Sequence, residues 1–187
     1  YELNFATIGD TDFFDLIERS VEQIQRYYPD ASVYIYDWGF TSTERRTLDS
    51  YDEVTLVNWG KKHLSFRIEQ AIENSGILNK MSRAVTGREI TDFHKRNAFL
   101  YRQKPYCLLD ACRRIEKRII YVDGDTLITN SIDEVIDDNY DIGVTLRPRA
   151  EIEAAKARGD YHVLNAGVIF FNTDAESIEH FIREWID

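Results

Sequence analysis

Two aspartates that flank a glycine are the residues of this chain best suited to do chemistry. Asp123 and Asp125 follow the apolar run 118–122, which predicts a strand buried on both faces. Side chains at i and i+2 of an extended chain lie on the same side, so these two carboxylates repel each other unless a cation lies between them. Hard divalent cations prefer such oxygen ligands and share them with substrate phosphates, and Gly124 leaves room for a phosphate or ribose beside the backbone. The pattern predicts a metal site for a phosphorylated ligand; a polar turn that caps a strand is the alternative.

The charge of the chain changes sign just before this motif. The sequence has 23 lysines and arginines against 33 aspartates and glutamates, a net charge of −10, which makes it a poor general partner for nucleic acid. Residues 95–118 nevertheless carry eight basic side chains, and residues 119–141 carry seven acids and no base. This succession suits an anionic ligand held together with a cation. Charge alone favours a solvated helix face followed by a solvated loop.

Length and composition predict one domain, or one domain with part of a second. The 187 residues are enough to bury a core, and no apolar run approaches the ~18 residues needed to cross a bilayer. Cys107 and Cys112 are five positions apart on an expected helix, which suggests neither a disulfide nor a zinc site, so a reducing, cytoplasmic compartment is expected. No signal peptide is visible, but the chain starts at Tyr1 rather than Met, so a targeting segment ahead of it stays an open alternative.

Strands and helices are expected to alternate along most of the chain. Strands are predicted at residues 3–8, 33–36, 54–57, 118–122, 141–146 and 163–171. Helices are predicted where apolar residues recur every three or four positions: Phe14 to Tyr28, Leu64 to Ile72, Pro105 to about Arg114, and a last helix that buries Ile178, Phe181, Ile182 and Trp185. The alternation predicts an α/β fold with a mainly parallel central sheet. Ligands of such sheets bind beyond the carboxyl ends of the strands, where Asp37, Asp123 and Arg147 would lie.

Two other motifs with paired aspartates fit the spacing less well. An EF-hand loop that began at Asp123 would place Leu127 and Ile128 where an oxygen ligand and a glycine are needed. The stretch also resembles the Asp-x-Asp-x-Thr motif of haloacid dehalogenase phosphatases. In that motif the Thr lies two residues past the second Asp, whereas Thr126 follows Asp125 directly.

The order of several motifs resembles the core of GT-A glycosyltransferases, which use sugar nucleotides. These motifs are Lys104-Pro105, Leu108-Leu109-Asp110, the run from Arg118 to Leu127, and Ser131-Ile132-Asp133-Glu134. The stretch from Leu164 to Asn172 resembles their second signature, which lines the donor-sugar pocket, and Tyr36 to Gly39 resembles their second-strand turn. The closest likeness is to the family that contains glycogenin and bacterial lipopolysaccharide galactosyltransferases. The resemblance implies a Rossmann-like GT-A fold with helices on both faces of the sheet, in a single domain over 1–187 that is truncated at its C-terminus.

The resemblance also implies a role for each matching residue. Asp123 and Asp125 would bind Mn2+ or Mg2+, which bridges the two phosphates of the donor. The nucleotide would contact Ala6, Thr7, Asp37, Lys104 and Gly124, and the donor sugar would contact Asn165, Ala166, Gly167, Arg102 and Arg147. Structural alternatives stay open: strand core for Ala6 and Thr7, a turn aspartate for Asp37, and a solvated lysine at a helix start for Lys104.

The resemblance implies a third metal ligand, a histidine, beyond the last helix. The sequence has His63, His94, His162 and His180, and none of them has metal-pair spacing. His180 is expected to be a surface residue of the last helix. We assign no general base, because the segment that often carries catalytic groups in the family follows that helix.

The expected activity is metal-dependent hexosyl transfer from a nucleotide-diphosphate sugar, with UDP as the expected nucleotide and an acceptor that the sequence does not identify. The family likeness favours retention of the anomeric configuration. A sugar nucleotidyltransferase is one alternative, although the acidic stretch Gly9 to Asp12 stands where that class needs a basic, Gly-rich loop. The other alternative is a non-catalytic nucleotide- or carbohydrate-binding domain derived from a transferase.

Overall fold

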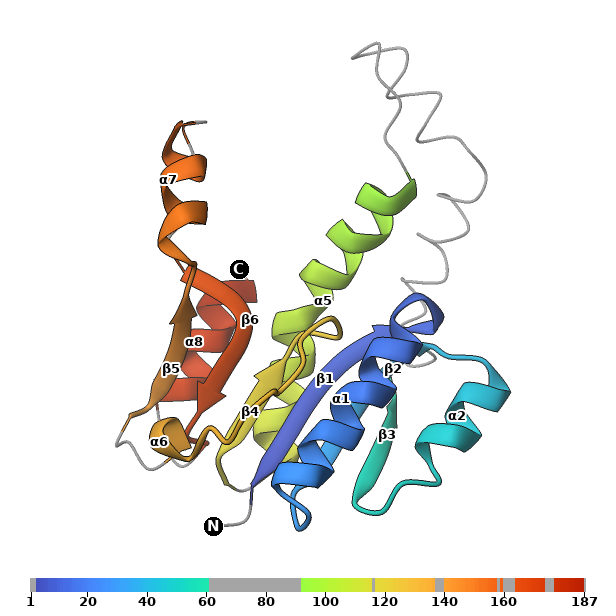
Figure 1. Ribbon diagram of the computed structural model, residues 1–187. Coiled ribbons are helices and arrows are strands. Elements are labelled where there is room, and N and C mark those ends of the chain that lie inside the picture. The colour runs from blue at the N-terminus through green and yellow to red at the C-terminus, as the bar shows by residue number, and fades with distance from the viewer. Residues whose placement is uncertain are drawn as a thin grey trace.

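A six-stranded sheet forms the centre of the computed structural model (Figure 1). The structure describes residues 3–60, 92–115, 117–136, 140–157, 159, 164–173 and 177–186, with the side chains of 92–102 outside the description. The strand order is β3-β2-β1-β4-β6-β5. The bounds are β1 (Asn4–Asp10), β2 (Ser32–Gly39), β3 (Val54–Asn58), β4 (Ile119–Val122), β5 (Ile142–Leu146) and β6 (Leu164–Phe171). Strands β1 to β4 are parallel and β6 runs antiparallel to both β4 and β5, so the predicted mainly parallel sheet is confirmed.

Helices cover both faces of this sheet, as the sequence predicts (Figure 1). One face is covered by α1 (Phe14–Tyr27) and α2 (Ser42–Leu48), which bury Ile17, Val21, Ile24 and Leu48. The other face is covered by α5 (Asp92–Arg114) and α8 (Ser177–Ile186). The remaining helices are short: η1 (Thr11–Phe13), α6 (Asp133–Ile136) and α7 (Arg149–Ala157).

Strand β4 contributes to both hydrophobic layers. Ile120 and Val122 pack in the layer under α1, whereas Ile119 and Tyr121 pack in the layer under α5 and α8. All four residues are buried, because successive side chains of a strand point to opposite faces. The prediction of a strand buried on both faces is therefore confirmed, and the Asp-Gly-Asp motif leaves the sheet from its middle.

One predicted helix starts earlier in the structure than expected, and some observed helices were not predicted. The helix expected to start at Pro105 starts at Asp92, and Pro105 lies inside it. Its first half lacks an apolar period, so the pattern that marks a helix became visible only near Pro105, a residue that commonly opens helices. Helices α2 and α7 were not predicted, although the Thr41-x-x-Glu44 capping box is a sequence signal for the start of α2. The helix expected over Leu64 to Ile72 lies outside the described residues.

The buried face of α8 is narrower than predicted. Ile178 and Ile182 are fully buried, whereas Phe181 and Trp185 are 42% and 39% exposed. The two aromatic rings instead lie against each other, with their centroids 6.4 Å apart. Ile178 and Ile182, which are one turn apart, pack in the layer under α5 and α8, and Ile186, one further turn along, packs against it.

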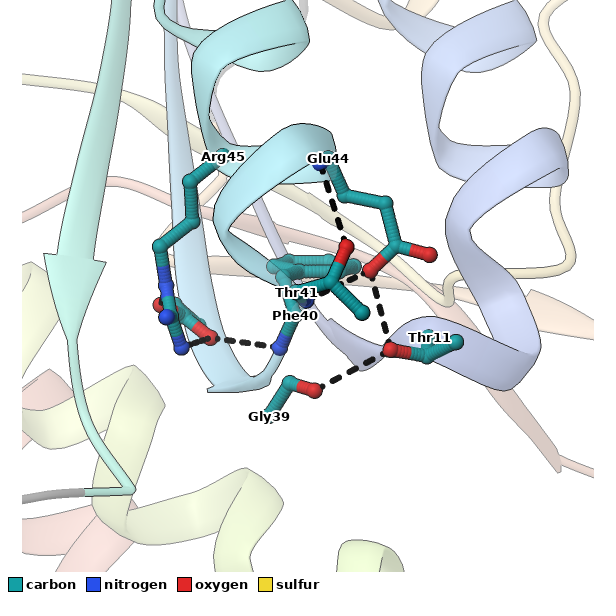
Figure 2. Close-up of polar contacts among 7 residues, drawn as sticks. Thr11, Gly39, Phe40, Thr41, Glu44 and Arg45 are labelled. Carbon is teal, nitrogen blue, oxygen red and sulfur yellow. Dashed lines mark hydrogen bonds and ion pairs between the residues drawn. The ribbon is translucent and has the colours of Figure 1, made fainter.

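The turn from β2 into α2 is built around the buried carboxylate of Asp37, as Figure 2 shows for its surroundings. Asp37 accepts a hydrogen bond of 3.0 Å from the Phe40 amide and bonds of 2.5 and 3.2 Å from the Arg45 guanidinium. Thr41 and Glu44 form the capping box of α2. The Glu44 carboxylate also accepts from the Thr11 hydroxyl at 2.9 Å, which links this turn to the end of β1.

Replacing Arg45 should destabilise the protein, because Asp37 is only 3% exposed and would keep a buried charge without its guanidinium partner. We expect Arg45→Met to lower the free energy of unfolding by about 2 kcal/mol, less than for a fully buried pair because Arg45 is 32% exposed. The matched control is Arg46→Met on the same helix. Its guanidinium contacts only the exposed Thr43 hydroxyl among the contacts seen, so we expect a change within about 0.5 kcal/mol. Urea denaturation measures both, and equal losses would contradict the role given to the Asp37–Arg45 pair.

Candidate functional site

The topology of the sheet brings several of the predicted site residues to the same end of neighbouring strands. Strands β1 to β4 are parallel, and β5 shares their direction because both β4 and β5 are antiparallel to β6. The start of β6 therefore lies beside the ends of β4 and β5. Asp123 to Asp125 follow β4, Arg147 follows β5, and Asn165 to Gly167 lie in the first half of β6.

The carboxylate of Asp123 is fixed by contacts from three directions. The Asp123 amide donates to the Gly167 carbonyl at 2.7 Å, which extends the β4–β6 ladder by one residue. Its Oδ1 atom accepts from the Tyr121 hydroxyl at 2.9 Å and lies 2.6 Å from the Lys104 ammonium. A Cβ atom on residue 167 would lie 3.3 Å from Oδ2, closer than carbon normally packs, so a side chain at this position would crowd that oxygen. The side chain is 24% exposed and so remains within reach of a ligand.

A bulge in β6 shapes the wall opposite Asp123. Val144 of β5 pairs with Ile169, but the next residue, Thr145, pairs with Asn165, so 166–168 have no partner on β5. Bulges of this kind redirect groups next to functional sites. Here the Ala166 carbonyl accepts from the Lys104 ammonium at 2.9 Å, and the Gly167 amide donates to the Asn165 side-chain oxygen at 2.9 Å. The bulge therefore places Asn165, Ala166 and Gly167 around the Asp123 side chain.

Tyr121 and Lys104 are the buried residues of the site. Lys104 is 4% exposed, and its Nζ atom lies 4.9 Å from the centroid of the Tyr121 ring. Burial raises the pKa of the Tyr121 hydroxyl well above its ordinary value, and the negative charges of Asp123 and, to a smaller degree, Asp125 raise this pKa further. The hydroxyl therefore stays protonated and donates to Asp123.

Gly124 lets the motif turn tightly against the end of β1. The Thr126 amide donates to the Asp123 carbonyl at 2.9 Å, which closes a turn over 123–126. A Cβ atom on Gly124 would lie 3.1 Å from the Ile8 carbonyl oxygen and 3.4 Å from the Ile17 side chain. The close approach needs a glycine, and it leaves Asp125 exposed at the tip of the turn.

The other predicted nucleotide contacts lie deeper in the sheet. Ala6 is 1% exposed and pairs with Tyr121 across β1 and β4. The Thr7 hydroxyl is buried and makes no hydrogen bond within the described part of the chain. Asp37 is held by Arg45 on the α2 side of the sheet. Ala6 and Thr7 lie in β1, next to β4, and Asp37 lies in β2, one strand further away, so these residues are not part of the cluster around Asp123.

Of the two predicted arginines and the four histidines, Arg147 and His180 have side chains within the described part of the chain. Arg147 is half-buried at the end of β5. The Arg102 side chain lies outside the described residues, as do His63, His162 and the side chain of His94. His180 is exposed on α8, as predicted.

Tyr121 is the site residue that the sequence analysis missed. It was counted only as part of an apolar strand, yet it stands two residues before Asp123 and so points to the same side. A buried tyrosine needs a partner for its hydroxyl, and an aspartate at that spacing is a suitable one. This signal was present in the sequence.

The donor atoms of the cluster suit a divalent metal ion. In the described part of the chain, no group of three or more His, Cys, Asp or Glu side chains is arranged to hold a metal. Asp123 and Asp125 supply carboxylate oxygens; the Lys104 ammonium contacts Oδ1 of Asp123, whereas Oδ2 lies beside Gly167. The residues fit Mn2+ or Mg2+ provided that phosphates and water complete the coordination, as is common for Mg2+.

Separately, no described helix is both long and apolar enough to span a bilayer.

Comparison with known proteins places the fold. No protein-family model and no curated protein matches the sequence. Solved structures do match. The galactosyltransferase LgtC, in complex with donor and acceptor sugar analogues, aligns with a TM-score of 0.55 and 13% identity over 98% of this chain and 59% of its own. The apo form of the glycosyltransferase GlyE from Streptococcus pneumoniae TIGR4 has a TM-score of 0.53 and 12% identity over 100% of this chain and 38% of its own.

A fungal enzyme gives a third match of the same quality. Core-mannan synthase A from Aspergillus fumigatus, in its Mn/GDP form, has a TM-score of 0.54 and 10% identity over 100% of this chain and 64% of its own. The present chain thus spans less than two thirds of each of these three proteins. The sheet order, the covering helices and these alignments together show that the chain has the Rossmann-like GT-A fold of glycosyltransferases.

Proposed function

We propose that this chain is the donor-binding, catalytic domain of a glycosyltransferase that transfers a hexose from a nucleotide-diphosphate sugar, with UDP as the nucleotide. The observation that carries the proposal is the Asp123 carboxylate. It is held at the end of the central strand β4 through Oδ1, with Oδ2 beside Gly167 and the side chain 24% exposed. In this proposal 1–187 acts as a single domain, and the acceptor is left open.

Asp123 and Asp125 are the proposed ligands of Mn2+ or Mg2+. When bound, the ion neutralises charge on the leaving diphosphate and so favours breakage of the bond to the anomeric carbon. The Mn/GDP form of core-mannan synthase A supports a divalent ion in this fold, and it makes GDP the second nucleotide to test. Retention of configuration is part of the proposal and rests on the motif resemblance.

The bulge of β6 is the proposed wall for the donor sugar. Asn165 is oriented by the bond from the Gly167 amide to its side-chain oxygen, and Thr145 donates to its carbonyl at 3.0 Å. An amide oriented in this way is suited to bind sugar hydroxyls. Arg147 and Arg102 are further proposed sugar contacts, and the Arg147 guanidinium would approach from the end of β5.

The nucleotide is proposed to lie along the ends of β1 and β2. Ala6 and Thr7 would present backbone groups, Gly124 would allow close approach at the turn, and Asp37 would face the base or ribose. The buried Thr7 hydroxyl, which makes no hydrogen bond among the described residues, supports a polar ligand near this strand. Lys104 is proposed to bring positive charge toward the diphosphate.

The proposal predicts that UDP binding depends on both the metal and the aspartate pair. We expect Mn2+ to tighten UDP binding, and Asp123→Asn or Asp125→Asn to reduce the Mn2+-dependent affinity by at least about tenfold, because even groups that only orient metal ligands contribute about 10- to 100-fold. The control is Asp30→Asn, an exposed aspartate before β2 at the opposite edge of the sheet. Calorimetric titration with Mn2+ and with a chelator measures each affinity.

An assay of turnover distinguishes an enzyme from the main alternative, a non-catalytic binding domain. Hydrolysis of a panel of UDP- and GDP-sugars, with each product quantified, should show metal-dependent cleavage of one donor that the two aspartate variants lose. Metal-dependent nucleotide binding with no hydrolysis of any donor would support a non-catalytic binding domain instead. UDP and GDP binding that ignores both Mn2+ and the two variants would overturn the metal site.

Adding a methyl group at Gly167 should disturb the same carboxylate without changing any charge. A Cβ atom there would lie 3.3 Å from Asp123 Oδ2 and 3.1 Å from the Asn165 side-chain oxygen, closer than carbon normally packs. We expect Gly167→Ala to weaken Mn2+-dependent UDP binding about fivefold, the scale of about 1 kcal/mol for a tight insertion. UDP affinity in the presence of a chelator serves as the internal control and should stay unchanged. An unaltered affinity with Mn2+ would show that Oδ2 is not the metal-facing oxygen.

A further inference from the structure

Lys104 is buried at the point where the proposed metal site meets the proposed sugar wall. Lys104 is 4% exposed, and lysines are almost never so buried unless they are paired. Nζ lies 2.6 Å from Asp123 Oδ1, donates to the Ala166 carbonyl at 2.9 Å, and stands 4.9 Å from the Tyr121 ring centroid. The ammonium thus connects helix α5 with the end of β4 and with the bulge of β6.

The two oxygens of the Asp123 carboxylate have different surroundings. Oδ1 binds both the ammonium and the Tyr121 hydroxyl, and these contacts fix the plane of the carboxylate. Oδ2 instead lies beside Gly167, where a Cβ atom would come within 3.3 Å of it. A metal ion would therefore bind Oδ2 of Asp123, whereas Oδ1 is occupied by contacts with Lys104 and Tyr121.

The charge of Lys104 also changes what a metal ion meets. Two carboxylates alone would present two negative charges, whereas two carboxylates and one ammonium present one. Repulsion between the ammonium and a divalent ion is strong in this setting, because the lysine is buried and poorly screened by water. A nucleotide diphosphate supplies additional anionic oxygens, so the ion and the diphosphate together restore the balance of charge.

We propose that Lys104 is a positioning residue that makes metal binding depend on the sugar-nucleotide diphosphate: it holds Asp123 by Oδ1, and its charge opposes binding of the ion alone. This inference rests on the proposed function, since it assumes that the ion lies at Asp123 and Asp125. It gives Lys104 a role through Asp123 and beyond a direct phosphate contact. The bond to the Ala166 carbonyl ties the same lysine to the sugar wall, so the ligands of the ion and the sugar pocket are held by one group.

Titration of the full chain with Mn2+ tests this, followed by electron paramagnetic resonance of the free ion, without nucleotide and with saturating UDP. We expect Lys104→Met, which keeps the length of the side chain and removes its charge, to bind Mn2+ alone about tenfold more tightly than the wild type. The tightening of Mn2+ binding by UDP should shrink by a similar factor. A lysine with a merely structural role would leave the affinity for Mn2+ alone unchanged or lower it when replaced.

Three further variants keep the result interpretable. Lys104→Gln removes the charge but keeps a donor near Ala166, and it replaces Lys104→Met if that protein does not fold. Tyr121→Phe removes the hydrogen bond to Oδ1 but no charge, so it should not tighten binding of Mn2+ alone. Lys156→Met removes an exposed lysine paired with Glu153 on α7, and it should behave as the wild type.

The outcomes distinguish this inference from the proposed function. Mn2+ binding that needs UDP, is lost in Asp123→Asn and is tightened without nucleotide in a Lys104 variant supports both. Mn2+ binding that is lost in Asp123→Asn but is no tighter in either Lys104 variant overturns the role of Lys104 and leaves the metal site intact. A wild type that binds no Mn2+ even with UDP overturns both.

Discussion

The hydrogen bond from the Asp123 amide to the Gly167 carbonyl joins the two halves of the site. It exists because β6 runs antiparallel to β4, so that the end of one strand lies beside the start of the other. A parallel strand at this position would have put Asn165 and Ala166 at the far edge of the sheet. The direction of a single strand therefore decides whether the acidic turn and the proposed sugar wall face each other.

The two hydrophobic layers keep that arrangement rigid. Strand β4 is buried on both sides, with Ile120 and Val122 toward α1 and Ile119 and Tyr121 toward α5. Its last residue is followed directly by Asp123, so the packing of the core also fixes the position of the Asp123 backbone. Lys104 reaches the same carboxylate from α5, a helix that also packs Cys107, Leu108 and Ala111 against the sheet. Polar contacts in the site are thus anchored by apolar packing on either side of it.

Much of this framework could be predicted from the sequence because it depends on local pattern. The run 118–122 predicted a buried strand, which the structure confirms, and Asp123 and Asp125 follow that strand directly. The cation site at these two aspartates stays a proposal. The contacts of Lys104 could not be predicted, because they depend on how α5 lies across β4 and β6. The outward turn of Phe181 and Trp185 likewise depends on which side of α8 meets its neighbours, and the sequence showed only that the helix has apolar positions. Arg45 as the partner of Asp37 needed the geometry of the β2–α2 turn.

The bulge at 166–168 separates two registers within one strand. From Val168 onward, β6 is aligned by its pairing with β4, whereas Leu164 and Asn165 are aligned by β5. A change of length in the bulge would therefore not slide Ile169, Phe170 or Phe171 out of the core. If this segment is the sugar wall that we propose, its length and sequence could diverge and alter the sugar preference while the hydrophobic interior stayed the same.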